Sequence, residues 1–376
     1  MKRFLTVIVL FVASIFTYAQ ETSLDDGCKA YLVGDEFGHI YYEKNIDQKL
    51  PLASVTKMMT IMVAFDDIQK GKVHLKDKVR VPKEIAGIGG SRIWMKEDMD
   101  FTLEDLLKAS AIYSANNATE AIAYYISHGN VDKFVKRMNG KLKDMNLDKM
   151  IEYHTPTGLP PHMTDTNMDI GNARGLYFLS MNADRNKRYM KLASMKETKI
   201  KVGKIKNRNN LLGEEGIYGI KTGHHDTAGY NICIVSDENN VKLFVVVLGG
   251  KDEKTRDKIV LDKIREFHDE YQYRVVLSKD TPLSKVKVLA GDEDYVEIYP
   301  DADLKKVFKV DSKINIRVKK EHFVTAPVKP GEKLGEYEVF IDDEKVLAGK
   351  LYAKQGVSIY SPFKKQKKEK NSWQKF

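Results

Sequence analysis

The sequence predicts an α+β fold in two parts: a domain of helices and antiparallel strands over residues 26–275, then a small all-β domain over residues 276–357. Three observations support this prediction. Paired strand-like segments occur near both ends of the first part, a strongly apolar helix lies between them, and helical periodicity largely disappears after about residue 275. At 376 residues, the chain has room for one large domain and a smaller one.

The start of the chain has the order of a secretory signal peptide. Lys2 and Arg3 precede an apolar run over residues 4–16, and small or polar residues follow that run. The run is short for a bilayer span, so we expect cleavage after Ala19, with a retained N-terminal anchor helix as the alternative. The mature protein is then exported and acts in the periplasm or at the outer face of the cytoplasmic membrane.

The first part of the mature chain shows alternating strand and helix patterns. Residues 30–45 alternate around a Gly-rich turn, which predicts a β-hairpin. Residues 54–69 are apolar on nearly every side, as in a buried helix, and residues 101–127 have helical spacing with one buried face. Residues 229–236 and 242–249 read as two strands joined by a turn.

The remaining segments complete the prediction. Residues 252–273 form a long amphipathic helix, and short strands at 285–289, 295–299 and 313–318 are separated by Asp, Gly and Pro turns. Residues 358–376 form a lysine-rich tail, in which six lysines and one glutamate follow Ser361 around Trp373 and Phe376.

The net charge and the residue composition of the chain limit the kinds of partner and cofactor that we expect. The formal net charge of +9 suits an anionic surface such as a cell-wall polymer or acidic lipid. No nucleic-acid-binding module is present in the sequence, so we expect no nucleic-acid partner. The run 224–226, His-His-Asp, lacks the spacing of a metal motif, and we expect neither a metal site nor a cofactor. Cys28 and Cys233 could pair after export or remain two separate buried thiols.

Three short motifs carry the chemistry. Ser-x-x-Lys begins at Ser54 and also at residues 284, 361 and 372, Ser-x-Asn begins at residues 114 and 180, and Lys-Thr-Gly occurs once, at residues 221–223. In a chain this rich in lysine, each match alone is weak. Only the matches at Ser54, Ser114 and Lys221 combine a consistent order with suitable local structure.

The first motif can supply an activated nucleophile. Ser54 opens the apolar helix, near the positive end of the helix dipole, and Lys57 lies three residues later on the same face. Apolar surroundings lower the pKa of a lysine, and a neutral amine can accept the serine proton. The alternative is a surface lysine whose stem covers apolar side chains.

The other two motifs suit supporting roles. Ser114 could relay a proton, and the Asn116 amide could bind both Lys57 and a substrate peptide, although Ser and Asn also favour helix breaks and caps. Lys221, Thr222 and Gly223 close the strand before the 229–249 pair. They suit a strand edge that binds an anionic, extended peptide, and an ordinary strand end is the alternative.

Taken together, the motifs resemble those of penicillin-binding proteins and class A β-lactamases. The flanking residues are most similar to the low-molecular-mass penicillin-binding proteins that act as serine D-alanyl-D-alanine carboxypeptidases. The similar stretches are residues 42–45, 52–60, 114–118, 219–224 and 326–335, and the resemblance covers roughly residues 28–357. It implies a β-lactamase/transpeptidase-like domain, in which helices flank an antiparallel sheet beside a helical subdomain, followed by a small all-β domain.

The resemblance also implies a reaction. Ser54 would attack the bond between the two terminal D-alanines of a peptidoglycan stem peptide, and Lys57 would take its proton. Ser114 and Lys221 would deliver a proton to the leaving amine, and backbone N–H groups of Ser54 and His224 would form the oxyanion hole. Water would then hydrolyse the acyl-enzyme, whereas a β-lactam would acylate the same serine and remain. The residues implied to contact substrate are Thr222, Gly223, His224 and Arg256, of which Thr222 and Arg256 would hold the terminal carboxylate.

Departures from the family leave alternatives open. Asn117 stands where the family usually has Asp. The short tail has barely any apolar face, so we expect either weak electrostatic membrane association, with Trp373 and Phe376 entering the interface, or a disordered, solvated tail. A β-lactamase is disfavoured because no Glu-x-x-Leu-Asn pattern follows Asn116 and because of the added β domain. A D,D-endopeptidase that cuts cross-links, or a non-catalytic cell-wall or β-lactam binding protein, remains an alternative.

Overall fold

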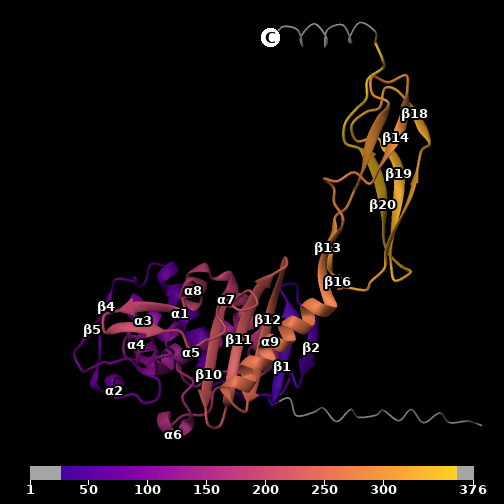
Figure 1. Ribbon diagram of the computed structural model, residues 1–376. Coiled ribbons are helices and arrows are strands. Elements are labelled where there is room, and N and C mark those ends of the chain that lie inside the picture. The colour runs from indigo at the N-terminus through magenta and orange to yellow at the C-terminus, as the bar shows by residue number, and fades with distance from the viewer. Residues whose placement is uncertain (1–26, 362–376) are drawn as a thin grey trace, which may run out of the picture.

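The computed structural model describes residues 27–361, and residues 1–26 and 362–376 lie outside the described part of the chain. The predicted signal peptide and most of the lysine-rich tail therefore fall outside it. Within residues 27–361, no helix is long and apolar enough to cross a membrane. Two bodies follow one another along the chain, the first of helices and strands and the second of strands alone (Figure 1).

A five-stranded antiparallel sheet forms the centre of the first body, with the strand order β10-β11-β12-β1-β2. The two predicted strand pairs are confirmed, and they meet because β1 pairs with β12. β10 forms one edge of this sheet. The strands are β1 (Ala30–Asp35), β2 (Ile40–Lys44), β10 (Ile217–His225), β11 (Gly229–Glu238) and β12 (Val241–Gly250).

Both faces of the sheet are covered. Successive side chains of a strand point to opposite faces, so Cys233 and Val235 join the core with the helical region, whereas Ile232 and Ile234 pack against α9 (Glu253–Glu270). Figure 1 shows α9 lying across the sheet. This double burial explains why β11 and β12 are nearly continuous apolar runs.

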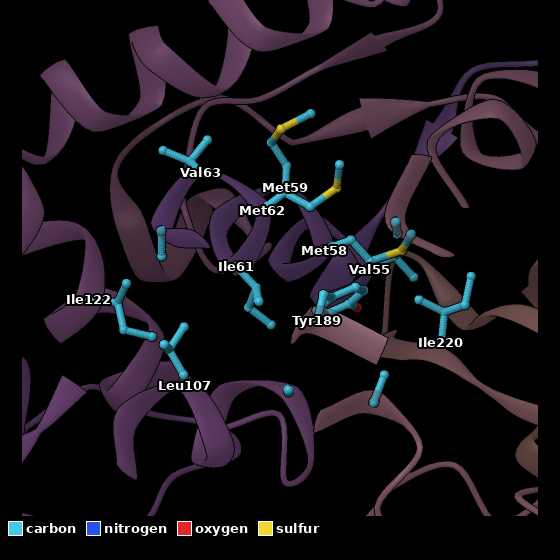
Figure 2. Packing of buried hydrophobic residues seen from close by; sticks show 14 of the residues in the cluster. Val55, Met58, Met59, Ile61, Met62, Val63, Leu107, Ile122, Tyr189 and Ile220 are labelled. Atoms are coloured by element: carbon cyan, nitrogen blue, oxygen red, sulfur yellow. The ribbon is translucent and has the colours of Figure 1, made fainter. Parts of the chain in front are cut away.

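The helical region is built around α1. Figure 2 shows Ile61 of α1 on the side of Leu107 and Ile122, which come from α3 and α4, and Met58 on the side of Tyr189 and Ile220, which come from α8 and β10. The longer helices are α1 (Lys57–Gln69), α3 (Leu103–Ala111), α4 (Asn116–Ile126), α5 (Val131–Asp144), α7 (Ala173–Arg185) and α8 (Lys187–Ala193). Two single turns, α2 (Lys83–Ala86) and α6 (Pro161–Thr164), complete the region.

Short strands in the loops that connect these helices pair with one another in small sheets. They form the three-stranded sheet β3-β7-β6 and the pairs β4–β5 and β8–β9. Their bounds are β3 (Leu50–Pro51), β4 (Lys78–Arg80), β5 (Asp100–Thr102), β6 (Ile151–Glu152), β7 (Ile170–Gly171), β8 (Glu197–Ile200) and β9 (Gly203–Lys206).

Two predicted helices are interrupted. The segment 54–69 begins as a 3-10 turn, η1 (Ala53–Thr56), so the prediction that Ser54 opens the α-helix itself is wrong by three residues; tightened first turns of this kind are common at helix ends. The segment 101–127 breaks between α3 and α4, where Ser114 has a φ of +64°. A left-handed residue cannot continue an α-helix.

The predicted helix over residues 252–273 ends earlier, at Glu270. Tyr271 is already extended and begins β13 (Tyr271–Leu277), which pairs with β16 (Leu304–Lys309). The Tyr271 ring stacks on Phe267 at a centroid distance of 5.3 Å. Aromatic and β-branched residues in this segment favour a strand, and that preference outweighs the helical periodicity.

The second body has a core of its own, which includes Val286, Ile298, Tyr337 and Leu351. Its six-stranded sheet has the order β17-β19-β20-β15-β14-β18. In Figure 1, β13 and β16 lie between this sheet and the first body. The strands are β14 (Ser284–Leu289), β15 (Tyr295–Pro300), β17 (Ile314–Lys320), β18 (Phe323–Thr325), β19 (Lys333–Ile341) and β20 (Glu344–Ala353).

Candidate active site

The side chain of Lys57 is fully buried at the start of α1 and lies against three oxygen atoms. Its Nζ atom is 2.7 Å from Ser54 Oγ, 2.8 Å from Asn116 Oδ1 and 2.6 Å from the carbonyl oxygen of Thr157. These groups come from η1, from the first residue of α4, and from the loop that follows β6. Ser54 is partly exposed, so a substrate can reach its hydroxyl while the lysine stays covered.

Burial lowers the pKa of Lys57 well below its ordinary value, and the positive charge of Lys221 lowers it further. The carboxylates of Asp169 and Glu120 act in the opposite direction. Burial raises the pKa of Glu120 itself to about 7, although Lys57 opposes that shift. A lysine whose pKa is lowered in this way can carry a lone pair near neutral pH, as a general base must.

A buried carboxylate holds the loop that supplies the Thr157 carbonyl. Asp169 Oδ2 accepts hydrogen bonds from the hydroxyls of Thr56 and Thr155, both at 2.8 Å. Its Oδ1 accepts from the backbone N–H groups of His154, at 2.6 Å, and Thr155, at 2.9 Å. Burial raises the pKa of Asp169, while these four hydrogen bonds lower it. One side chain thus ties the loop to the turn that contains the nucleophile.

The same loop packs directly on the backbone of that turn. Gly158 has a φ of +77°, and a Cβ atom placed on it would lie 1.9 Å from the carbonyl oxygen of Ala53. Ala53, the residue before the nucleophile, has a φ of +50°, which is uncommon for a residue other than glycine. The fold therefore holds the nucleophile turn in a specific backbone conformation by close packing.

The side chain of a second buried lysine, Lys221 of β10, reaches the turn between α3 and α4. Lys221 Nζ donates to Ser114 Oγ at 2.9 Å and to the carbonyl oxygen of Thr222 at 2.8 Å. Burial lowers the pKa of Lys221 to about 7, and the charges of Arg208 and Arg256 contribute to the shift. A group that titrates near neutral pH next to a hydroxyl can pass a proton in either direction.

Lys221 lies in the middle of β10, so the prediction that residues 221–223 close their strand is wrong. The strand continues to His225 because its pairing with β11 extends to the register His225–Gly229. A Cβ atom on Gly223 would lie 3.1 Å from the backbone nitrogen of Ser54, so β10 passes against the nucleophile turn. Thr222 is buried at this edge of the sheet, and the ring of His224 stacks on Tyr230 at 3.9 Å.

Two arginines add positive charge near Lys221. Arg256 of α9 is buried and pairs with Asp257 at 2.6 Å and with Glu253 at 3.3 Å. Arg208 is exposed, and its guanidinium lies 4.2 Å from the centroid of the Tyr113 ring. The two arginines come from different segments of the chain, and both positive charges help to lower the pKa of Lys221. Positive charge gathered around Lys221 favours the binding of an anion beside this residue.

Sequence reasoning missed four groups that this arrangement brings in: the Thr157 carbonyl, Asp169, Glu120 and Arg208. None of them belongs to a recognisable motif.

The cysteines are separate buried thiols, because Cys233 faces the helical region and Cys28 belongs to the core on the other face of the sheet. Among residues 27–361, no group of His, Cys, Asp and Glu side chains is arranged to hold a metal ion.

Comparison with known proteins gives matches for both bodies. Residues 18–252 match the sequence model of a family described as D-alanyl-D-alanine carboxypeptidase, and residues 271–358 match that of the C-terminal domain of penicillin-binding protein 5. The chain is similar to D-alanyl-D-alanine carboxypeptidase DacF of Bacillus subtilis, with 26% identity over the full length of both chains. It is 27% identical to D-alanyl-D-alanine carboxypeptidase DacA of Haemophilus influenzae, over 84% of this chain and 81% of that one.

A solved structure extends the similarity to the fold. Penicillin binding protein 5 from Haemophilus influenzae aligns with a TM-score of 0.65 at 26% identity, covering 88% of this chain and 98% of that one. The α+β architecture with a following all-β body, predicted from the sequence, is confirmed by this likeness.

Proposed function

Because this chain belongs to the D-alanyl-D-alanine carboxypeptidase family of low-molecular-mass penicillin-binding proteins, we propose that it removes the terminal D-alanine from peptidoglycan stem pentapeptides through an acyl-enzyme on Ser54. It is a serine-type D-alanyl-D-alanine carboxypeptidase, and a β-lactam is expected to acylate the same serine. The proposed chemistry needs no metal or cofactor.

The three oxygen atoms around Lys57 Nζ carry this proposal. Two of them, Asn116 Oδ1 and the carbonyl oxygen of Thr157, can only accept hydrogen bonds, whereas the Ser54 hydroxyl can also donate. A neutral amine has two N–H bonds and one lone pair. It can therefore donate to both carbonyl oxygens and keep its lone pair for the Ser54 proton.

Acylation follows from that arrangement. Lys57 takes the hydroxyl proton as Ser54 Oγ attacks the carbonyl carbon between the two D-alanines. Negative charge then develops on the carbonyl oxygen, and donors placed in advance stabilise it. We assign this role to the backbone N–H groups of Ser54 and His224; the close approach of Gly223 to the Ser54 nitrogen supports the assignment.

The C–N bond then breaks, and the departing D-alanine amine must gain a proton. Lys57 holds the proton taken from Ser54, and the Ser114 hydroxyl, backed by Lys221 at 2.9 Å, offers a path for it to the amine. Water next attacks the ester and gives a proton to Lys57. Ser54 recovers its hydroxyl proton as the acyl group leaves, so the enzyme returns to its starting state.

Substrate binding is assigned to the edge of the sheet. β10 is an edge strand, and an extended peptide can pair with such an edge through its backbone. The positive charges of Lys221, Arg208 and Arg256 favour the carboxylate of the terminal D-alanine at this position. Thr222 and Arg256 are proposed to bind that carboxylate, next to Gly223 and His224.

We assign catalysis to residues 26–275 and treat residues 276–357 as a separate domain, because all of the site residues lie in the first body and the second has its own core.

The signal-like segment supports export with residues 1–19 removed. N-terminal sequencing of the mature protein tests the export proposal, and an intact residue 1–19 segment contradicts it. Weak membrane contact by the lysine-rich tail is tested by vesicle co-sedimentation with residues 361–376 deleted; binding that does not change rules it out.

One assay tests the proposed activity. The mature protein is incubated with a stem pentapeptide ending in D-alanyl-D-alanine, and free D-alanine is measured, with Ser54→Ala as the control. We expect release by the wild type alone. Covalent labelling of Ser54 by a fluorescent penicillin without D-alanine release contradicts the carboxypeptidase proposal, and hydrolysis of cross-linked dimers then tests the endopeptidase alternative.

A further inference from the structure

A backbone segment between α2 and β5, residues 89–93, runs beside the turn that joins α3 to α4. The backbone N–H of Asn116 donates to the carbonyl oxygen of Ser91 at 2.6 Å. The Ser91 hydroxyl donates in turn to the carbonyl oxygen of Tyr113 at 3.1 Å. The 89–93 segment is therefore bound to the residues on either side of Ser114.

This segment also orients the Asn116 side chain. Asn116 Oδ1 accepts from Lys57, and its Nδ2 donates to the carbonyl oxygen of Gly89 at 2.9 Å. Rotating the carboxamide by half a turn would bring its NH2 group against the lysine amine and its oxygen against a carbonyl oxygen. Both contacts are unfavourable, so the Gly89 carbonyl selects the orientation in which Asn116 presents an acceptor to Lys57.

The side chain of Asn117 holds the other end of the segment. It is fully buried, its Oδ1 accepts from the backbone N–H of Ile93 at 3.2 Å, and its Nδ2 donates to the Ile93 carbonyl oxygen at 2.9 Å. The carboxamide thus pairs with both backbone groups of one residue. An ionised aspartate at this position could accept the first hydrogen bond but could not donate the second.

We propose that Asn117 is a positioning residue for acylation: by holding Ile93, it keeps the Gly89 carbonyl where that carbonyl orients Asn116 against Lys57. The side-chain hydrogen bonds of Asn117 go to the backbone of Ile93 and Ala118 and not to Lys57 or Ser54. The inference rests on the proposed function, because it assigns the Asn116–Lys57 contact to the formation of the acyl-enzyme.

A double-mutant cycle tests the inference. The second-order rate of acylation by a fluorescent penicillin is measured for wild type, Asn117→Ala, Asn116→Ala and the double variant, together with the Tm of each. Asn117→Ala should slow acylation about 10- to 100-fold, the loss expected when a reacting group is displaced. In the Asn116→Ala background, the same change should have almost no further effect, because Asn117 acts through Asn116.

Two further variants keep the test decisive. Asn117→Asp has nearly the same shape, but it replaces the donor to Ile93 by a carboxylate oxygen and adds a negative charge. It takes the place of Asn117→Ala in the cycle if that variant does not fold. Asn182→Asp is the matched control, because Asn182 Nδ2 donates to the carbonyl oxygen of Phe178 on α7, and its loss should leave acylation unchanged.

The outcomes separate the two proposals. A wild type that acquires no label overturns the proposed function and this inference with it. If the wild type is labelled, three results overturn the inference alone: an unchanged rate in Asn117→Ala or Asn117→Asp, the same fold-loss in both backgrounds, or equal slowing by Asn182→Asp.

Discussion

The amine nitrogen of Lys57 lies 2.7 Å from the hydroxyl oxygen of Ser54, in a position where the lysine side chain has no exposed surface. The two residues are neighbours on one helical face, so their contact is local. The other two partners of the amine, Asn116 and the Thr157 carbonyl, lie 59 and 100 residues further along the chain. The environment that makes Lys57 a base is therefore assembled by the tertiary fold.

The first prediction separates a base from a fixed charge at position 57. Arginine keeps the positive charge and the donors but does not deprotonate in proteins. We expect Lys57→Arg and Lys57→Met to slow acylation by about 10²- to 10⁴-fold, the usual contribution of a general base. Acylation rates with fluorescent penicillin, checked against the Tm of each variant, test this. Activity of Lys57→Arg within tenfold of wild type would show that charge alone suffices.

The second prediction concerns the pH dependence of acylation. Below its pKa of about 7, Lys221 is positively charged, and this charge lowers the pKa of Lys57. In Lys221→Met the pKa of Lys57 should rise, so neutral Lys57 appears only at higher pH. The acid limb of the acylation rate should then move to higher pH, on top of any general slowing. A rate–pH profile of unchanged shape would argue against this coupling.

The third prediction concerns stability and follows from the same lysine. The pKa of Lys221 is about 7 in the folded protein and 10.5 as its unperturbed value. Between these values the unfolded state binds a proton that the folded state lacks, so this group adds stability as the pH rises. The free energy of unfolding of wild type, minus that of Lys221→Met, should increase by up to about 1.4 kcal/mol per pH unit. Urea unfolding at pH 7 to 10 measures it, and a difference that is flat across this window contradicts it.

The fourth prediction tests Asp169 as the residue that ties the loop to the nucleophile turn. Asp169→Ala leaves two buried hydroxyls and two backbone N–H groups without their acceptor. We expect a loss of at least about 2 kcal/mol in stability and slower acylation.

Asp184→Ala is the control for this variant. Asp184 accepts from the Tyr218 hydroxyl and from Lys242, neither of which is a hydrogen-bond partner of Lys57. This variant should lower the Tm but keep the acylation rate. If it slows acylation as much as Asp169→Ala does, loss of stability alone accounts for the effect.

The fifth prediction tests carboxylate recognition. Arg256→Gln should lower kcat/KM about 10- to 100-fold for a peptide with a free C-terminal carboxylate, since hydrogen bonds to charged groups contribute about 1.5–3 kcal/mol. Arg208→Gln should lower it less, because it removes a nearby positive charge and no proposed hydrogen bond. A peptide with a C-terminal amide should be affected much less. Steady-state kinetics on the two peptides decide the point, and equal losses on both would assign the arginines to folding or to general electrostatics.

Much of the fold could be predicted because its signals are local. Alternation around a turn predicted the β1–β2 hairpin, and the all-apolar segment predicted α1. The errors lie at element ends, where tertiary contacts compete with periodicity. Tyr271 shows this: its ring packs on Phe267, four residues earlier, as helical spacing predicts, but its backbone pairs with β16, and that partner cannot be read from the spacing of residues 252–273.

The sequence by itself determined which residues have the chemistry: a serine three positions before a lysine in an apolar helix, and two companion motifs in a fixed order. Residue type and short spacing suffice for that, because helical geometry places such neighbours on one face. Only the tertiary structure decided the surroundings of Lys57, namely a backbone carbonyl, the buried carboxylate of Asp169 and an asparagine oriented by the 89–93 segment. Backbone carbonyls carry no residue signature, and burial and charge act through space, so the pKa of Lys57 is a property of the folded chain.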